Sequence, residues 1–486
     1  MKTKINFLLS LILLGLVFPF QAAANINPDT TKIVILSLND QHAKIDNYDK
    51  LKALVDKIRK ENKHVLLFAA GDNFTGNPVV DMYPDKGYPI IDLMNEVGFN
   101  AATLGNHEFD YGQEILLKRM MQAKFPYLSA NVTDNTGKLK ISPYKIFTLS
   151  DGIKIAVIGA IQLGSNGLPD SHPNNLQNIS FTDGIQSIEK YKSLRDSCNI
   201  FIALTHLGFE ADQQLAKLVP QIDLIMGGHT HTLTKPAFIE NDVTIMQAGS
   251  GVKSLSMATI LLVDGKVVII TPEMLNVSSF DKQDEAIAEK IKQYNDNKEL
   301  NREIGYALSD ILDKDELGSL MTDAILSLKN IDFAFQNNGG IRIDYLKKGP
   351  ITLKDVYKLD PFGNEVILFK MRSDEIKSLI INAYKDSDNS IDLQVAGMKY
   401  TIITDEDGVA MDVIMETSKG KSLKNKKHYR VAVNSYIASS YKFDHKDQGR
   451  SLFKTTAQTL IDFLTIKKEV NYSGQKRAFK TVKALQ

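Results

Sequence analysis

The chain has 486 residues, of which 43% are hydrophobic and 24% are charged, and its formal net charge at pH 7 is zero. This length exceeds what one hydrophobic core usually holds, so it favours two or more globular domains. The balanced charge argues against a nucleic-acid polymer or an anionic membrane as the partner, and it favours a small-molecule substrate.

The first 24 residues have the order of a secretory signal peptide. Lys2 and Lys4 precede an apolar run from Phe7 to Phe20, and small residues close the segment at Ala24. The run is shorter than the roughly 20 residues that a membrane span requires. We therefore expect cleavage near Ala24, export to the periplasm or the medium, and no stable membrane insertion afterwards. Loss of the two lysines takes the net charge of the mature chain from zero to about −2.

Between residues 31 and 275, short β-branched apolar runs alternate with amphipathic stretches. This pattern predicts a layered α/β domain built on buried strands. The clearest strand candidates cover residues 32–38, 64–70, 154–159, 198–204 and 222–226. Cys198 begins the fourth run and is the only cysteine, so no intrachain disulfide can form, and we interpret it as a buried and unreactive thiol.

From about residue 281 to 305 the composition changes to Lys, Glu, Asp, Asn and Gln, with Ile287, Ile291 and Tyr294 at helical spacing. This pattern predicts an exposed helix that connects two domains. The remaining residues mix helical and strand-like runs, which predicts a second domain of the α+β class. The expected divisions are a signal peptide at 1–24, a first domain at 25–280, the connecting helix at 281–305 and a second domain at 306–486.

Five short motifs rich in His, Asp and Asn follow predicted strands of the first domain. They are Asn39-Asp40-Gln41-His42, Gly71-Asp72-Asn73, Gly105-Asn106-His107-Glu108, Thr205-His206-Leu207-Gly208 and Gly227-Gly228-His229-Thr230-His231. The carboxyl ends of strands are where α/β folds build their sites, and imidazole with carboxylate ligands suits Zn²⁺, Mn²⁺ or a similar cation. Each motif alone also fits a capping or turn residue. Together they contain five of the nine histidines and predict a metal centre.

In this order, the five motifs resemble those of the calcineurin-like metallophosphoesterases, and specifically of the 5′-nucleotidase family. The resemblance extends over nearly the whole mature chain. It implies a layered α/β/β/α metallophosphoesterase domain, then an α+β domain that recognises the substrate, and two divalent cations that activate a water for attack on a phosphate ester. The ligands implied by the resemblance are Asp40, His42 and His231 for one cation, Asn106, His206 and His229 for the other, and Asp72 as the bridge between them.

The residue that follows Asn106 has a separate role in this family. The resemblance implies that His107 stabilises the phosphoryl transition state and the leaving oxygen, and that Asp110 orients its ring. A positioned proton donor of this kind contributes about 10²–10⁴ in rate. The alternative is that His107 only packs beside the site.

The second domain carries segments that resemble the substrate-binding loops of the family. Residues 337–342 read Asn-Asn-Gly-Gly-Ile-Arg, and the resemblance implies substrate contacts for Asn337 and a phosphate or carboxylate contact for Arg342. It also implies that Phe362, in an Asp-Pro-Phe-Gly-Asn loop, and Phe443 clamp a nucleobase. Such stacking contributes about 1–3 kcal/mol per base. The alternative for each ring is that it fills the core.

Two parts of the second domain depart from the family pattern. Ser440, Tyr441 and Lys442 replace the glycines that usually precede the second clamping ring, which changes the backbone freedom of that loop. The segment 308–318 lines up with one that often supplies further phosphate-binding arginines, but here it has none, and only Lys314 offers a positive charge. Substrate preference can therefore differ from that of other members.

These observations predict an exported hydrolase that releases phosphate from nucleoside 5′-monophosphates or related nucleotides. Enzymes that act on 2′,3′-cyclic nucleotides with 3′-nucleotidase activity, on nucleotide sugars, or on a small sulfur anion as thiosulfohydrolases do are alternatives, because the metal site is shared and only the second domain discriminates. A catalytically inactive surface binding protein is the non-enzyme alternative, and the complete ligand set argues against it. A nuclease would share the metal chemistry, but the even charge disfavours it.

Overall fold

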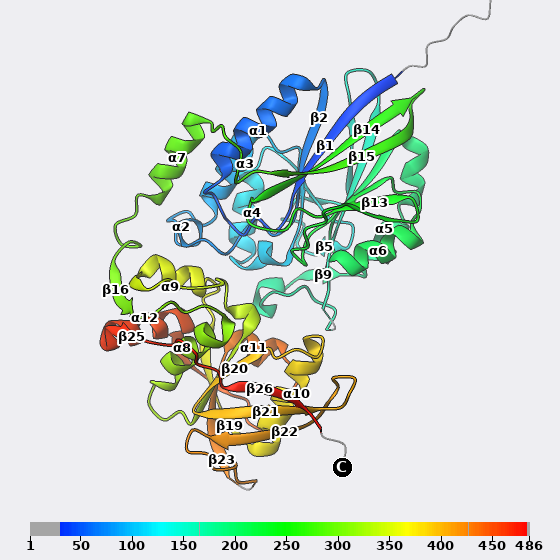
Figure 1. Ribbon diagram of the computed structural model, residues 1–486. Coiled ribbons are helices and arrows are strands. Elements are labelled where there is room, and N and C mark those ends of the chain that lie inside the picture. Colours follow the sequence, from blue (N-terminus) through cyan, green and yellow to red (C-terminus); the bar gives the residue numbers. More distant parts are fainter. Residues whose placement is uncertain (1–29, 165, 426, 484–486) are drawn as a thin grey trace, which may run out of the picture.

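The fold is taken from a computed structural model, which describes residues 30–164, 166–425 and 427–483. The predicted signal peptide lies outside these residues. Two lobes follow one another along the chain, and in Figure 1 the first, coloured blue to green, lies above the second, coloured yellow to red. Within the described residues, no helix is long and apolar enough to cross a bilayer.

Two sheets form the centre of the first lobe. The seven-stranded sheet has the order β15 (Lys266–Asn276), β14 (Ser254–Val263), β1 (Thr30–Leu38), β2 (His64–Ala70), β3 (Ala101–Thr103), β4 (Tyr127–Leu128) and β6 (Ile141–Ser142). The six-stranded sheet has the order β12 (Phe238–Glu240), β13 (Val243–Met246), β11 (Leu224–Met226), β10 (Ile200–His206), β8 (Lys154–Ile161) and β7 (Tyr144–Thr148). All five strands expected from apolar runs are present, with ends that differ by up to two residues.

Successive side chains of a strand pack on opposite faces of its sheet. Ile33 and Ile35 of β1 belong to a core between the two sheets, to which strands of both sheets contribute. Val34 and Leu36 face the other way and pack with helices α1 (Tyr48–Glu61), α3 (Tyr88–Val97) and α4 (Gln113–Gln122). The outer face of the six-stranded sheet packs on α5 (Gly184–Glu189) and α6 (Phe209–Leu218). The first lobe therefore has the predicted α/β/β/α layers.

The carboxyl ends of parallel strands bring the five motifs together. β1 pairs in parallel with β2, and β2 with β3, while β10 is parallel to both β8 and β11. The motifs at residues 39–42, 71–73 and 105–108 follow β1, β2 and β3, and those at 205–208 and 227–231 lie at the ends of β10 and β11. Because the two sheets pack face to face, both groups of loops meet at one edge.

The segment between the lobes contains a shorter helix than the sequence predicts. Helix α7 spans Glu285–Asn295, and the chain enters strand β16 at Glu303–Ala307. The side chain of Ile287 is buried in the core that lies between the seven-stranded sheet and helices α1, α3 and α4. The helix is therefore half-buried rather than exposed along its whole surface, and the chain crosses to the second lobe at residues 296–302.

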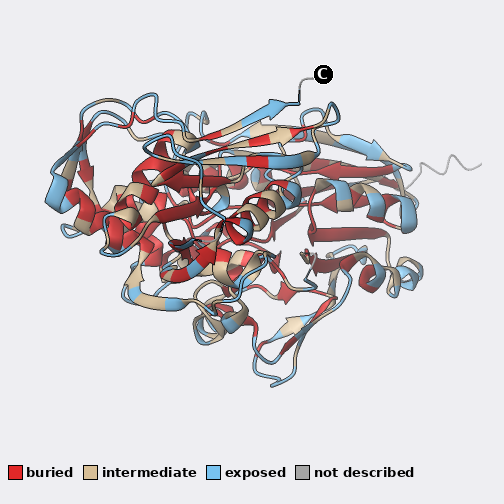
Figure 2. Cartoon of the chain, turned by 90° about the horizontal axis from the view of Figure 1, so that it is seen from below, coloured by how far each residue is buried: buried red, intermediate tan, exposed pale blue. Residues whose placement is uncertain are grey.

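The second lobe has the predicted α+β fold. Its largest sheet has the order β20 (Leu393–Ala396), β17 (Phe333–Asn337), β23 (His428–Asn434), β19 (Glu365–Arg372) and β24 (Arg450–Thr455). Two smaller sheets have the orders β18 (Gly349–Thr352), β16, β25 (Glu469–Val470) and β22 (Ala410–Thr417), β21 (Met398–Thr404), β26 (Ala478–Val482). The accompanying helices are α8 (Lys314–Leu326), α9 (Leu353–Leu359), α10 (Ser373–Asp386), α11 (Ser435–Ser440) and α12 (Thr456–Lys467). Buried residues concentrate in the central strands of each lobe and in the loops that follow them, whereas outer helix faces and strands such as β15 and β24 are exposed or half-buried (Figure 2).

Candidate metal centre and substrate cavity

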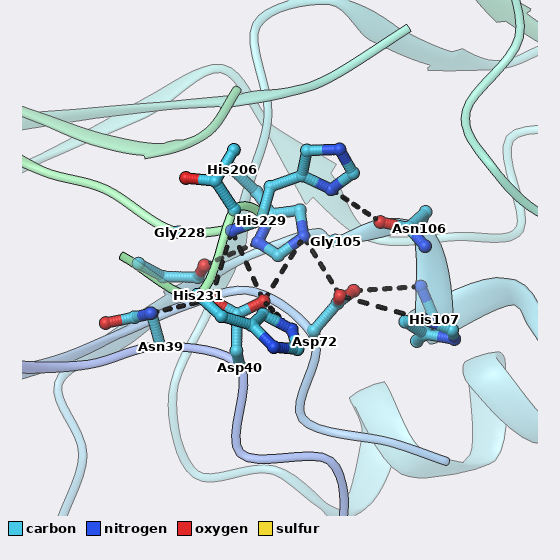
Figure 3. Close-up of polar contacts among 12 residues, drawn as sticks. Asn39, Asp40, Asp72, Gly105, Asn106, His107, His206, Gly228, His229 and His231 are labelled. Atoms are coloured by element: carbon cyan, nitrogen blue, oxygen red, sulfur yellow. Dashed lines mark hydrogen bonds and ion pairs between the residues drawn. The ribbon is translucent and has the colours of Figure 1, made fainter. Parts of the chain in front are cut away.

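Side chains from the five loops converge where the two sheets meet (Figure 3). The possible ligand atoms form three overlapping groups, and within each group the atoms lie within 4.8 Å of one another. The groups are Asp40 with His42 and His231, His42 with Asp72 and His107, and Asp72 with His206 and His229. The carboxylate of Asp72 lies in the middle, because its Oδ2 is 3.1 Å from Nε2 of His206 and 3.9 Å from Nε2 of His42. The residues expected from the motifs therefore occupy one compact cluster.

Asn106 joins this cluster through its side-chain amide. Its Oδ1 atom lies 3.2 Å from Nδ1 of His229. Its Nδ2 atom donates a hydrogen bond of 3.1 Å to the backbone carbonyl of Asp170. Because the amide nitrogen is held by that carbonyl, the oxygen is turned towards the histidines and can bind a cation.

Backbone carbonyls orient two of the histidines. Nδ1 of His42 lies 3.1 Å from the carbonyl oxygen of Thr75, and Nδ1 of His206 lies 2.8 Å from that of Ala70. A carbonyl oxygen only accepts hydrogen bonds, so we assign the proton of each neutral ring to Nδ1, which leaves Nε2 able to bind a cation. Nε2 of His206 is buried without a hydrogen bond of acceptable geometry among the described residues. Its near neighbour is Oδ2 of Asp72 at 3.1 Å, and two such atoms side by side fit ligands of one cation.

The electrostatics of the cluster also favour cation binding. Burial raises the pKa of Asp72, but the charges of His206 and His107 outweigh this and hold that pKa well below its usual value. Burial and the charge of His206 lower the pKa of His229 to about 4, so this imidazole is neutral at pH 7. Burial lowers the pKa of His206, but Asp72 and Asp40 outweigh this and raise it to about 10. A cation that binds His206 must therefore displace a proton.

Five of the seven predicted ligands have left-handed backbone conformations. The φ angles are 49° at Asp40, 48° at His42, 52° at Asp72, 85° at His229 and 54° at His231. Such conformations cost about 1–3 kcal/mol each for non-glycine residues and cluster at functional sites. The loops also pack closely, since a Cβ atom on Gly105 would lie 2.2 Å from Oδ1 of Asp72. The glycine of the third motif is therefore required by the approach of the Asp72 carboxylate.

Glu108 ties two of these loops together. Its buried carboxylate accepts hydrogen bonds from the backbone N–H groups of Asp72 at 2.9 Å, of Asn73 at 2.7 Å and of Gly105. Burial and the charge of Asp72 raise the pKa of Glu108 to about 7, although the backbone donors lower it, and each hydrogen bond is stronger when the carboxylate is ionised. Sequence reasoning assigned Glu108 no role, although its place in the third motif was a signal that could have pointed to it.

His107 contacts Asp110 as expected, with Nδ1 of the imidazole 2.6 Å from Oδ2 of the carboxylate. The hydroxyl of Ser171 donates to the other oxygen of Asp110 at 3.1 Å. Ser171 and Asp170 lie in a loop that follows β8, and that loop contains none of the five motifs. Sequence reasoning missed this support because nothing in the loop marks it as part of a site.

A cavity of about 750 Å³ opens beside the cluster. The second lobe contributes to its wall Asn337, Arg342, Phe362, Tyr436 and Tyr441. The ring of Phe362 stacks on that of His107, with centroids 5.7 Å apart and an interplanar angle of 20°. The guanidinium carbon of Arg342 lies 5.6 Å from the centroid of the same Phe362 ring. Three of the four substrate-binding residues expected from sequence therefore face the metal ligands across one cavity.

Phe443, the fourth, is not among the described residues that line this cavity. Its centroid lies 5.9 Å from that of Phe369 and 4.7 Å from that of His445, so the ring packs on the core of the second lobe. Tyr441 lines the cavity instead, and its hydroxyl donates to Asp392. Both rings pack against the core of the second lobe, but of the two only Tyr441 is among the described residues that also line the cavity. The clamping role expected for Phe443 stays a prediction, and Tyr441 is the ring of this loop that lies at the cavity wall.

Comparisons with known proteins agree with this geometry. A family model described as calcineurin-like phosphoesterase matches residues 33–233, and one described as 5′-nucleotidase, C-terminal domain, matches residues 301–443. The 5′-nucleotidase of Vibrio cholerae serotype O1 is 29% identical over 482 residues, which cover 84% of this chain and 85% of that protein. Trifunctional nucleotide phosphoesterase protein YfkN of Bacillus subtilis is also 29% identical, over 87% of this chain but only 33% of its own length.

A crystal structure of a 5′-nucleotidase precursor from Thermus thermophilus shares the fold. It is 25% identical to this chain with a TM-score of 0.82, and the match covers 92% of this chain and 99% of that one. The fold, the ligand cluster and these matches together define a metal-dependent hydrolase of the calcineurin-like phosphoesterase class. Within that class, the chain belongs to the 5′-nucleotidase family.

We expect Glu108→Gln to weaken metal binding while the protein still folds, because an amide cannot offer two charged oxygens to three backbone donors. The loss of affinity should be about 10–100-fold, the usual effect of a residue that orients ligands. Competition with a chelator measures it, and circular dichroism checks the fold. Glu114→Gln, at an exposed position of α4, is the matched control. A folded Glu108→Gln protein with unchanged metal affinity would show that these hydrogen bonds do not position the ligands.

Proposed function

We propose that this protein is an exported hydrolase that releases phosphate from nucleoside 5′-monophosphates or related nucleotides. The observation that carries the proposal is one cavity with cation ligands on one wall and, on the other, Arg342 with the rings of Phe362 and Tyr441. A guanidinium suits phosphate and aromatic rings suit a nucleobase. The relatives named 5′-nucleotidase support the same substrate class. The proposed export depends on the signal-peptide pattern of residues 1–24.

The proposal divides seven ligands between two divalent cations. Asp40, His42 and His231 hold one, Asn106, His206 and His229 hold the other, and Asp72 binds both. The mixture of imidazole nitrogen and oxygen ligands suits Zn²⁺, Mn²⁺ or a similar ion. Such ions, when bound, hold the phosphate and lower the pKa of a bound water towards neutrality. The buried Nε2 of His206, which lies 3.1 Å from Oδ2 of Asp72 without hydrogen-bond geometry, supports this use of the cluster.

In this proposal His107 holds the proton that the leaving nucleoside oxygen needs. Asp110 accepts the hydrogen bond from Nδ1, so Nε2 is the atom left to donate. The backbone N–H of His107 also donates to Oδ1 of Asp72 at 2.9 Å, which fixes the residue relative to the ligand cluster. Stacking against Phe362 restrains the ring further.

The division at residues 281–305 follows from the same proposal, since all proposed cation ligands precede it and all proposed recognition residues follow it.

Hydrolysis of 2′,3′-cyclic nucleotides, nucleotide sugars or a small sulfur anion is the second candidate. The observation that favours it is the segment 308–318, which offers Lys314 where the family often has phosphate-binding arginines. Phosphate release, or sulfate release for the sulfur anion, across a panel of these substrates decides between the candidates.

Removal of the cations should abolish phosphate release, and their return should restore it. Asp72→Asn should lose nearly all turnover, because a neutral amide bridges two cations poorly. Phosphate release from AMP and elemental analysis are measured together, with Asp407→Asn at an exposed turn as the control. Full activity in a preparation shown to be metal-free contradicts the proposal.

His107→Ala should keep its metal but lower kcat by about 10²-fold or more, because the residue donates a proton and is not a ligand. Metal content and kcat are measured on the same preparation. Parallel loss of metal and activity would instead assign His107 to the support of the centre.

Phe362→Ala should raise the KM for nucleotides by the equivalent of about one stacking interaction, 1–3 kcal/mol. An aryl phosphate with a good leaving group needs no base stacking, so its rate should change little. Phe443→Ala is the matched control, because its ring packs on the core, and it should leave the nucleotide KM near that of the unmodified protein. An unchanged nucleotide KM in folded Phe362→Ala protein would argue against a clamp at Phe362.

A further inference from the structure

A second cavity, of about 390 Å³, lies next to the metal-ligand cluster. His231 and Arg342 line both cavities and therefore form the wall between them. The charged residues of this basic chamber are Lys44, Lys253, Lys314, Arg342, Asp46 and Asp344, contributed by both lobes. Nothing in the proposed cleavage of a nucleotide uses Lys44 or Lys253.

The cations of the basic chamber form no close ion pair among the described residues, although more distant carboxylates act on three of them, Asp81 on Lys44, Asp344 on Lys314 and Asp72 on Arg342. None of the four has a carboxylate oxygen within 4.0 Å among the described residues. Lys44 and Lys314 donate only to neutral backbone carbonyls, and a terminal nitrogen of Arg342 lies 3.2 Å from Nε2 of His42. Among the residues that line the chamber, four cations against two carboxylates leave a net formal charge of +2. Cations that lie together without close ion pairs repel one another, and a bound anion relieves that repulsion.

The lining of the basic chamber also restricts the kind of anion. The nucleotide cavity presents the rings of Phe362 and Tyr441, whereas the described lining of the chamber has no aromatic ring apart from the imidazoles of His42 and His231. A nucleobase therefore has no stacking surface there. Lysines attract phosphate as point charges, and an arginine binds it through a planar fork of donors. A small dianion without a base fits this lining.

We propose that the basic chamber is a second phosphate site, on the far side of Arg342 from the nucleoside. Its ligand is a phosphate group, which is either inorganic phosphate or the additional phosphate of a nucleoside diphosphate. The source of the phosphate rests on the proposed function, because that function releases inorganic phosphate and binds nucleotides, which can carry an additional phosphate. The existence of the site rests only on the chamber.

The binding test titrates inorganic phosphate into the full metal-loaded protein by calorimetry. Two phosphates per chain are expected, one at the metal centre and a weaker one in the chamber. Lys253→Gln should weaken the second by about two- to fivefold, the usual worth of one exposed charge, and Lys253→Gln combined with Lys314→Gln should weaken it further. Lys266→Gln, an exposed lysine of β15, is the control and should change neither affinity.

The proposal would be overturned if only one phosphate bound per chain. It would also be overturned if two bound and neither affinity changed in Lys253→Gln or in Lys44→Gln. This outcome differs from failure of the proposed function, in which no nucleotide is hydrolysed whatever the phosphate titration shows. The source is decided by kinetics on AMP and ADP. A rise in KM for ADP relative to AMP in Lys253→Gln assigns the site to a second substrate phosphate. Weaker inhibition by added phosphate, with that ratio unchanged, assigns it to inorganic phosphate.

Discussion

The metal centre depends on the buried carboxylate of Asp72 and the imidazoles around it. Nε2 of His206 lies 3.1 Å from this carboxylate, and Nε2 of both His42 and His107 lies 3.9 Å from it. In the absence of cations these groups shift one another's pKa values at largely buried positions. Cations that take the place of the protons stabilise the folded protein through the same contacts, so metal binding and the stability of this edge are linked.

The strained loops persist because rigid strands and buried polar side chains hold them. Asn39 is one such side chain, since its Nδ2 atom donates to Oδ2 of Asp40 at 2.6 Å and its Oδ1 atom accepts from the N–H of Ala248 at 2.6 Å. Glu108 does the same for the loops of Asp72 and Gly105. The cost of the left-handed residues is therefore met by contacts outside the ligand set, which is the usual arrangement at functional sites.

The sequence predicted the strands and the ligand cluster well because both follow from one rule. Buried parallel strands read as apolar runs, and polar residues at their carboxyl ends must lie at one edge. The contacts made by Ser171 were not predictable, because the loop after β8 reaches Asp110 only through the tertiary fold. The place of Tyr441 at the cavity wall was not predicted, for a related reason. Two aromatic residues two positions apart in an irregular loop give no pattern that tells which ring lines a cavity.

The two lobes contribute differently to the site, yet they meet at its centre. No proposed ligand comes from the second lobe, but Arg342 lies beside His42, and Phe362 stacks on His107. Binding energy from a nucleoside can therefore orient the phosphate directly against the residues that act on it. Ser440, Tyr441 and Lys442 stand where the family usually has glycines, and Tyr441 lines the cavity. Under the proposed function, a change in this loop alters the surface that meets the substrate and not the proposed cation ligands, all of which lie in the first lobe.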